Sequence, residues 1–342
     1  MMKIQLIHTY DDIISVENLL EAWKEFEKGK RNRKDVQEFS LRLMDHIFLL
    51  HNDLCNFTYK HGGYQAFKIN DPKPRNIHKA IVRDRLLHHA IYRKLYPFFD
   101  KTFIADSYSC RNDKGTHKAI NRFKKYFHKV SQNNTKTCWV LKCDIKKFFA
   151  NIDHDILLKI LSEYIPDKNI ITLLENIIES FSSFQPYHRK ERKIGLPLGN
   201  LTSQLFVNIY MNKFDQFAKH TMKAKYYIRY ADDFVFLATN KKQLENDIPA
   251  IENFLWEELR LEMHPDKVFI KTLSSGVDFL GMIIFSDHRI LRTKTKKRMV
   301  RRMRKNATLK RWRSYEGLLS HGNTHRLKTK IALKLDHALL HI

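Results

Sequence analysis

The chain of 342 residues lacks several features that would place it in a special class of protein. Its only four cysteines have neither the C-x-x-C spacing of a zinc site nor the density of a disulfide scaffold. No apolar run reaches about 18 residues, the length that predicts a membrane-spanning helix. The N-terminus becomes polar too soon for a signal peptide. We therefore expect reduced thiols, no membrane partner and a cytoplasmic location.

Acidic residues are also scarce relative to basic ones. The chain has 62 Lys and Arg against 37 Asp and Glu, so its formal net charge is +25. This excess predicts a polyanionic partner, and nucleic acid is the leading candidate. An anionic membrane surface is the competing interpretation. The length allows two or three domains.

Hydrophobic periodicity predicts helices with interposed strands. We expect helical segments over 13–54, a strand over 64–69, a turn over 71–74 and a helix over 79–96. A buried strand is expected over 139–145, followed by helices over 153–181 and a further helix after Gly199. A helix is also expected over 244–259, and basic helices over 289–313, where thirteen residues are Lys or Arg and none is acidic. This pattern predicts an α+β fold with helices on one side of a largely antiparallel sheet.

The most informative motif is Tyr230-Ala231-Asp232-Asp233, which lies between two apolar runs. Adjacent carboxylates between β-rich segments are unfavourable, because like charges repel and Asp is depleted in strands. A solvated hairpin tip is the alternative interpretation. A third carboxylate, Asp144, ends the apolar segment that begins at Trp139. Three such carboxylates would suit a two-metal phosphoryl or nucleotidyl transfer, since divalent cations prefer hard oxygen ligands.

Several motifs in order resemble reverse transcriptases, from Lys68 to Met282. Residues 230–233 are similar to that family's Y-x-D-D box, residues 141–149 to its motif A, and residues 195–204 to its motif B. The resemblance implies an RNA-directed DNA polymerase with a right-hand fold of fingers, palm and helical basic thumb. The implied division is a helical lead-in at 1–60, fingers at 61–138 with part of 155–195, a palm at 139–285 and a thumb at 286–342.

The resemblance also implies a metal site. Asp144 and Asp232 would be the primary ligands of two Mg²⁺ ions, for which Mn²⁺ could substitute. Asp233 would assist, and the carbonyl of Ile145 would complete a coordination sphere. Lys267 matches the motif D lysine, a candidate proton donor to the departing pyrophosphate. A solvated surface lysine is the alternative interpretation of Lys267.

Further residues would contact the deoxynucleoside triphosphate. Phe149 falls where the family places a steric gate against a ribose 2′-hydroxyl, although Phe148 or Phe149 could instead be a core residue. Arg75 would pair with triphosphate oxygens, for which a guanidinium is suited. The expected nucleotide contacts are Lys68, Arg75, Ile145, Phe149, Leu198, Gly199 and Gln204.

A second set of residues would contact the template RNA, the primer and their RNA/cDNA duplex. A close approach of backbone to the primer would explain Gly281. Arg111 and Lys114 could alternatively be solvated loop charges. The expected primer or template contacts are Arg111, Lys114, Phe279, Leu280, Gly281, Arg298, Arg301 and Arg302.

Motif B favours one branch of the family. Group II intron enzymes usually carry Ser-Pro where this chain has Ser203-Gln204, a pair that resembles the reverse transcriptases of diversity-generating retroelements. The resemblance implies copying of a template-repeat RNA with errors at adenines, and a small basic pentameric accessory protein. Leu198, where other members have glutamine, fits that branch. A group II intron-like or phage-defence enzyme and a non-catalytic RNA-binding scaffold remain alternatives.

Overall fold

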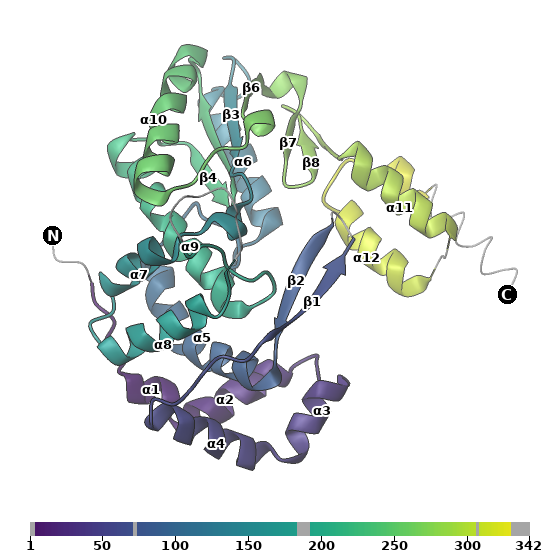
Figure 1. Ribbon diagram of the computed structural model, residues 1–342. Helices are drawn as coiled ribbons and strands as arrows, with labels where there is room; N and C mark the ends of the chain where they lie inside the picture. The colour runs from purple at the N-terminus through teal and green to yellow at the C-terminus, as the bar shows by residue number, and fades with distance from the viewer. Residues whose placement is uncertain (1–3, 71–73, 183–191, 306–307, 330–342) are drawn as a thin grey trace, which may run out of the picture.

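The computed structural model describes residues 4–70, 74–182, 192–305 and 308–329. Three antiparallel sheets are combined with helices (Figure 1). The expected α+β class with an antiparallel sheet is confirmed. Among the described residues, no helix is both long and apolar enough to cross a membrane.

Four helices form the N-terminal part of the structure. They are α1 (Tyr10–Ile14), α2 (Val16–Glu27), α3 (Lys34–Leu41) and α4 (Leu43–Cys55). Thr9 begins α1 with a capping box, and the Ser15 hydroxyl accepts a hydrogen bond from the Asn18 N–H at the start of α2. The helical prediction for this part is confirmed, with an additional break at Arg42.

A two-stranded hairpin rises from these helices toward the C-terminal part of the chain (Figure 1). Strand β1 (Tyr64–Ile69) is confirmed, and β2 (Arg75–Ala80) pairs with it at all six positions. The predicted helix over 79–96 is therefore wrong at its start, because α5 runs from Val82 to Thr102. Cross-strand pairing with β1 takes residues 75–80 into a strand, although the sequence gives no clear alternation there. The turn predicted over 71–74 lies largely outside the described residues.

The central sheet has the strand order β4-β5-β3-β6. Its strands are β3 (Trp139–Asp144), β4 (Tyr227–Tyr230), β5 (Asp233–Ala238) and β6 (Phe269–Thr272). Leu141 and Phe236 belong to the hydrophobic core that contains α9 and α10, whereas Val140 and Val235 belong to the cluster that contains α6. Helices therefore cover both faces of the sheet, which corrects the expectation of helices on one side. The physical reason is that successive residues of β3 and β5 are apolar, so both faces need cover.

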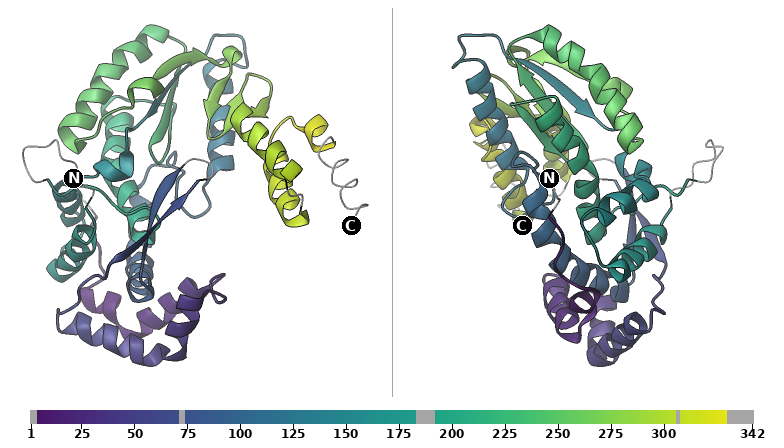
Figure 2. Two further views of the ribbon diagram at one scale, coloured as in Figure 1. Left: turned by 45° about the vertical axis from the view of Figure 1, so that its right-hand side comes forward. Right: turned by 90° about the vertical axis from the view of Figure 1, so that its left-hand side faces the viewer.

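Helices pack around this sheet and beside it (Figure 2). They are α6 (Thr116–Val130), α7 (His154–Ser162), α8 (Lys168–Glu179), α9 (Leu201–Gln216) and α10 (Lys241–Leu259). Short helical turns lie in the connections between these helices and the strands. They are η1 (Phe148–Asn151), η2 (Phe217–Thr221), η3 (Pro265–Lys267) and η4 (Leu273–Ser275).

The C-terminal part stands to one side of the central sheet (Figure 1). A three-stranded sheet leads into it, made of β7 (Val277–Phe279), β8 (Met282–Ile284) and β9 (Arg289–Leu291). Helices α11 (Thr293–Lys305) and α12 (Leu309–Leu319) follow. Met299 and Met303 of α11 are buried, while its basic residues lie mostly on the other face. The basic helices are confirmed, although the first residues of that segment form β9.

Candidate active site

Strand pairing brings the three aspartates together at one end of the central sheet. Asp144, the last residue of β3, lies directly opposite Asp233, the first residue of β5. Tyr230 also pairs with Asp233, so Ala231 and Asp232 form the turn between β4 and β5. The backbone N–H of Ile145 donates to the carbonyl of Asp232 over 3.2 Å, which fixes the turn beside the end of β3.

Burial and the neighbouring carboxylates both disfavour the charged form of Asp232. Burial, followed by the charges of Asp144 and Asp233, raises the pKa of Asp232 from 3.8 to about 6. Each cause disfavours the charged form of the group. The positive groups around this end of the sheet therefore do not fully neutralise its carboxylates.

Two lysines offset part of that charge. The Lys267 ammonium lies 2.5 Å from Oδ1 of Asp144, and the Lys142 ammonium lies 2.6 Å from Oδ1 of Asp233. Lys267 reaches the site from η3, and Lys142 reaches it from β3 itself. Three carboxylates face two ammonium groups, so a net negative charge remains.

The chemistry of this set suits a divalent cation. Carboxylate oxygens are hard ligands, and a cation would relieve the repulsion that raises the pKa of Asp232. In the part of the chain that the structure describes, no three Asp, Glu, His or Cys side chains are already gathered around one point. The two ion pairs hold Asp144 and Asp233, so a metal would compete with the lysines for them. Asp144, Asp232 and Asp233 are the residues that would hold it.

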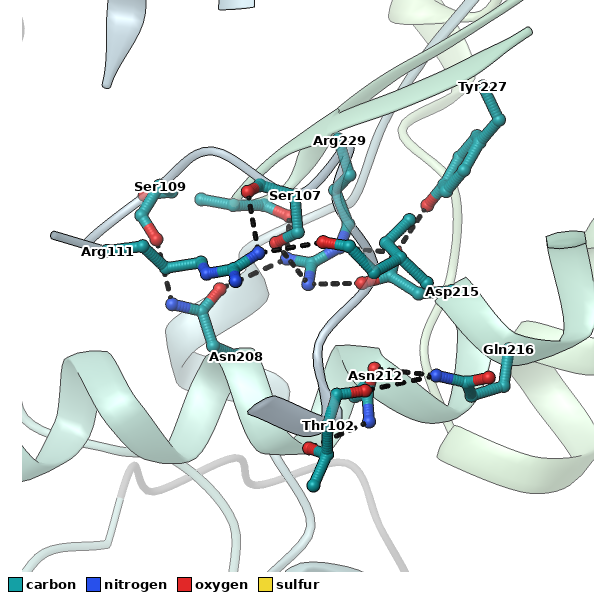
Figure 3. A network of polar contacts seen from close by, with 12 residues as sticks. Thr102, Ser107, Ser109, Arg111, Asn208, Asn212, Asp215, Gln216, Tyr227 and Arg229 are labelled. Carbon is teal, nitrogen blue, oxygen red and sulfur yellow. Dashed lines mark hydrogen bonds and ion pairs between the residues drawn. The ribbon is translucent and has the colours of Figure 1, made fainter. Parts of the chain in front are cut away.

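A buried polar network lies directly behind the aspartate turn (Figure 3). Arg229 of β4 is fully buried and forms an ion pair with Asp215 of α9, which is also fully buried. Its guanidinium additionally donates to Oγ of Ser107 over 3.1 Å and to Oδ1 of Asn208 over 3.3 Å. A further hydrogen bond of 3.2 Å reaches the carbonyl of Ala231, whose φ of 55° is uncommon for a residue with a side chain. The network therefore holds the turn that carries Asp232.

Sequence reasoning missed this network. The only signal was a charged residue, Arg229, inside the apolar run before the Y-x-D-D box. A charge in a buried strand requires a partner, but the sequence alone does not show that the partner is Asp215.

The expected nucleotide contacts lie partly on the β1–β2 hairpin. Lys68 and Arg75 are exposed there. The hairpin is tied to motif B, because the His78 N–H donates to the Leu198 carbonyl over 2.9 Å. Gly199 has a φ of 117°, and a Cβ atom there would lie 2.9 Å from Cγ2 of Ile77. Only glycine fits this contact without a shift.

The remaining expected nucleotide contacts lie near the end of β3 and on α9. Phe148 is buried, whereas Phe149 is half-buried, so the core residue of this pair is Phe148. The Leu196 N–H donates to the Phe149 carbonyl over 2.7 Å, which connects the end of motif A to the start of motif B. Ile145 is buried, and Gln204 is half-buried on α9.

Several expected primer or template contacts are engaged within the protein. Arg111 donates to Asp100 and to the backbone carbonyls of Asp100, Ile104 and Ser107, and Lys114 donates to the Ala105 carbonyl over 2.8 Å. Both residues therefore hold the loop between α5 and α6. Arg111, whose side chain is 6% exposed, is not a solvated loop charge, whereas Lys114 is half-buried.

The expected contacts in the C-terminal part differ in exposure. Phe279 is fully buried and stacks on Phe123, so its ring cannot reach a primer in this conformation. Leu280 and Gly281 have φ values of 51° and 87° and form the β7–β8 turn. The positive φ already explains Gly281, because no atom lies within 4 Å of a Cβ placed there. On α11, Arg301 and Arg302 are exposed and Arg298 is half-buried.

Comparison with known proteins decides the family. The model of the family described as reverse transcriptase (RNA-dependent DNA polymerase) matches residues 68–284, more than half of the chain. The chain belongs to the reverse transcriptase family. This span contains the three aspartates, strand β2 with the end of β1, and motif B.

Relatives of this reverse transcriptase include protein YkfC of Escherichia coli, 26% identical over 63% of this chain and 62% of that protein. The group II intron-encoded protein LtrA of Lactococcus lactis is 22% identical over 68% of this chain and 47% of its own length. The chain thus spans less than two thirds of the length of either relative. The solved structure of apo telomerase from Candida tropicalis, truncated from its C-terminal domain, matches 70% of this chain and 59% of its own. Its TM-score of 0.50 at 14% identity supports the right-hand polymerase fold.

Proposed function

We propose that this chain is an RNA-directed DNA polymerase that extends a primer with deoxynucleotides on an RNA template. One observation carries the proposal: Asp144 pairs with Asp233 and lies beside Asp232, within the span that matches the reverse transcriptase family. The net charge of +25 is also suited to a polyanionic template and product.

The aspartates would hold two Mg²⁺ ions, or Mn²⁺ in their place. Asp144 and Asp232 would be the main ligands, with Asp233 and the Ile145 carbonyl assisting. When bound, such ions activate the primer 3′-hydroxyl and neutralise charge on the leaving pyrophosphate. Lys267 is placed beside Asp144, from where its ammonium would donate a proton to the pyrophosphate.

The nucleotide would lie between the hairpin and the aspartates. Lys68 and Arg75 would bind its triphosphate, since both are exposed cations on the hairpin. Phe149 would exclude the 2′-hydroxyl of a ribonucleotide, and the incomplete burial of this last residue of motif A supports that role. Leu198, Gly199 and Gln204 would line the opposite side.

The primer–template duplex would lie along the C-terminal part. In this proposal the fingers comprise 61–138 with part of 155–195, the palm 139–285 and the thumb 286–342. The exposed Arg301 and Arg302 of α11 would contact phosphates without reading sequence. Arg298, Leu280 and Gly281 complete the proposed duplex contacts.

Primer extension on an RNA template, with Mg²⁺ and deoxynucleotides, tests the activity. Wild type should extend the primer and Asp144→Asn should not. Asp266→Asn is the matched control, because it neutralises an exposed acid one residue before Lys267 and should leave extension unchanged. Equal extension by wild type and Asp144→Asn would refute the proposal. If wild type fails with its cognate RNA, with and without an accessory protein, the chain is instead an RNA-binding scaffold.

Within the family, we place this chain with the enzymes of diversity-generating retroelements. It would copy a template-repeat RNA, misincorporate at adenines and act with a small basic pentameric accessory protein. Leu198 belongs to motif B, and its carbonyl accepts a hydrogen bond from the His78 N–H of β2, so its side chain lies in a segment held against the hairpin. The test compares adenine misincorporation by wild type and Leu198→Gln. An identical error rate in both would remove the proposed role of Leu198.

A group II intron-like enzyme is the second candidate, favoured by the similarity to LtrA. The two candidates share the same aspartates and differ in fidelity and partner. Faithful copying of adenines, without any response to a basic accessory protein, would favour the intron-like enzyme.

A further inference from the structure

We infer that Lys142 is a positioning residue that keeps the charge of Asp233 neutralised and its carboxylate turned away from Asp144. The inference rests on the proposed polymerase function, because it concerns the same carboxylates. It divides the three aspartates into two roles: Asp144 and Asp232 act on the reacting groups, while Asp233 is held by the protein.

The strand register creates the problem that Lys142 solves. Asp144 and Asp233 lie directly opposite each other, and like charges in such a pair destabilise a sheet. Lys142 is two residues before Asp144 and therefore lies on the same face of β3. Its own cross-strand partner is Val235, so Asp233 is its diagonal neighbour. A long side chain spans a diagonal of about 7–8 Å, and the Lys142 ammonium does reach Oδ1 of Asp233 at 2.6 Å.

The surroundings fix Lys142 in this position. Only 9% of its side chain is exposed, and such a lysine is rarely found unless it is paired. On the other side of β3, Phe269 of β6 is its cross-strand partner, and the Lys142 ammonium lies 5.9 Å from the centre of that ring. A departure from Asp233 would leave a poorly hydrated ammonium without a partner, which is costly.

The second lysine of the site is in a different situation. The side chain of Lys267 is 38% exposed, so its ammonium can leave Asp144 for water at little cost. Asp144 is therefore paired with a cation that can be displaced, whereas Asp233 is paired with one that cannot. A metal ion could therefore bind Asp144 and Asp232 more readily than Asp233, whose carboxylate is already paired with Lys142.

A double-mutant cycle tests this division. The variants are Lys142→Met, Asp233→Asn and the pair together, with Lys142→Arg to restore the charge. Lys271→Met is the matched control, because Lys271 also lies over the Phe269 ring, at 5.0 Å, but is exposed. Mn²⁺ affinity is measured by electron paramagnetic resonance, kcat by primer extension, and thermal unfolding verifies that each variant is folded.

Lys142→Met should lower kcat by about 10- to 100-fold, as expected when a residue that orients a ligand is removed. It should tighten Mn²⁺ binding by at least about tenfold, because one positive charge about 6 Å from a divalent ion is lost. In the Asp233→Asn background the change in kcat should disappear, whereas Mn²⁺ binding should still tighten, because the charge of Lys142 is lost in both backgrounds. Lys142→Arg should keep both quantities within about twofold of wild type, since a guanidinium also pairs with the carboxylate.

An equal change of kcat in both backgrounds would overturn the inference, because Lys142 would then act without Asp233. So would weaker Mn²⁺ binding by Lys142→Met, or a matching change in Lys271→Met. An inactive wild type in which Lys142→Met still tightens Mn²⁺ binding would contradict the proposed function, while the placement of the Lys142 charge beside the metal site would remain supported.

Discussion

Two charged clusters lie within a few residues of each other in this protein and differ in how fully they are balanced. In the first, Asp215 accepts hydrogen bonds from Arg229 at 2.8 and 2.7 Å and from the Tyr227 hydroxyl at 2.8 Å, all within the core. In the second, Asp144, Asp232 and Asp233 share two lysines, and the pKa of Asp232 is raised to about 6.

The difference indicates what each cluster is for. A buried ion pair with all its hydrogen bonds made adds little net stability but fixes the geometry of the groups around it. The Arg229 cluster does this for the aspartate turn through the carbonyl of Ala231. An incompletely neutralised carboxylate set is unfavourable in the isolated protein, and such perturbed groups concentrate at functional sites. The first cluster is therefore scaffold, and the second is available for chemistry.

The largest expected effect is on activity at the unbalanced cluster. Asp232→Asn removes a proposed metal ligand and should reduce primer extension by at least about 1000-fold, because metal coordination supplies several kcal/mol at the transition state. The measurement is kcat/KM on an RNA template, with Asp266→Asn as the control. A reduction of less than tenfold would show that Asp232 is not essential.

Substitutions in the Arg229 cluster should change the stability of the protein instead. Arg229→Met leaves Asp215 buried without its cation and should reduce the free energy of unfolding by about 3–5 kcal/mol. Adding Asp215→Leu to Arg229→Met removes the stranded charge and should recover most of that loss. Urea denaturation measures both. If the double variant is no more stable than Arg229→Met, the ion pair does not explain the loss.

The pH dependence of stability should also distinguish the clusters. The pKa of Asp232 is about 6 in the folded chain and near its ordinary value of 3.8 when unfolded. Between these values the folded chain binds a proton that the unfolded chain has released, so the free energy of unfolding falls as pH rises, by about 3 kcal/mol in total. Without divalent ions, Asp232→Asn should therefore be more stable than wild type at pH 7, and the difference should vanish near pH 4. A constant difference across this range would contradict the raised pKa.

The smallest effect is expected outside both clusters. Gly281→Ala adds a methyl group where nothing lies within 4 Å, so its cost comes only from the φ of 87° and should be about 1 kcal/mol. Gly63→Ala is the control, because Gly63 is equally open and has no positive φ. Equal stabilities in thermal unfolding would show that the β7–β8 turn tolerates a side chain.

The sequence predicted the part of the site that depends on local patterns. The apolar segment that ends at Asp144 and the Tyr230–Asp233 motif suggested a carboxylate cluster, and the resemblance to reverse transcriptases implied that Asp144 lies near Asp232 and Asp233. Arg229 and Asp215 were not predicted as a pair, since they meet only when β4 packs on α9. Strand β2 was missed because its polar residues are stabilised by pairing with β1. The burial of Phe279 and the internal bonds of Arg111 depend on contacts that no short motif encodes.

The His78 N–H donates to the Leu198 carbonyl, and Ile77 packs against Gly199 in the space that a side chain there would fill. These two contacts connect the hairpin to the segment just before α9. If the hairpin binds the triphosphate as proposed, a shift of the hairpin on binding would also shift the backbone at Leu198 and Gly199. Phosphate binding would then be coupled to base selection, and substitutions on the outer surface of the hairpin should alter copying accuracy without touching the base.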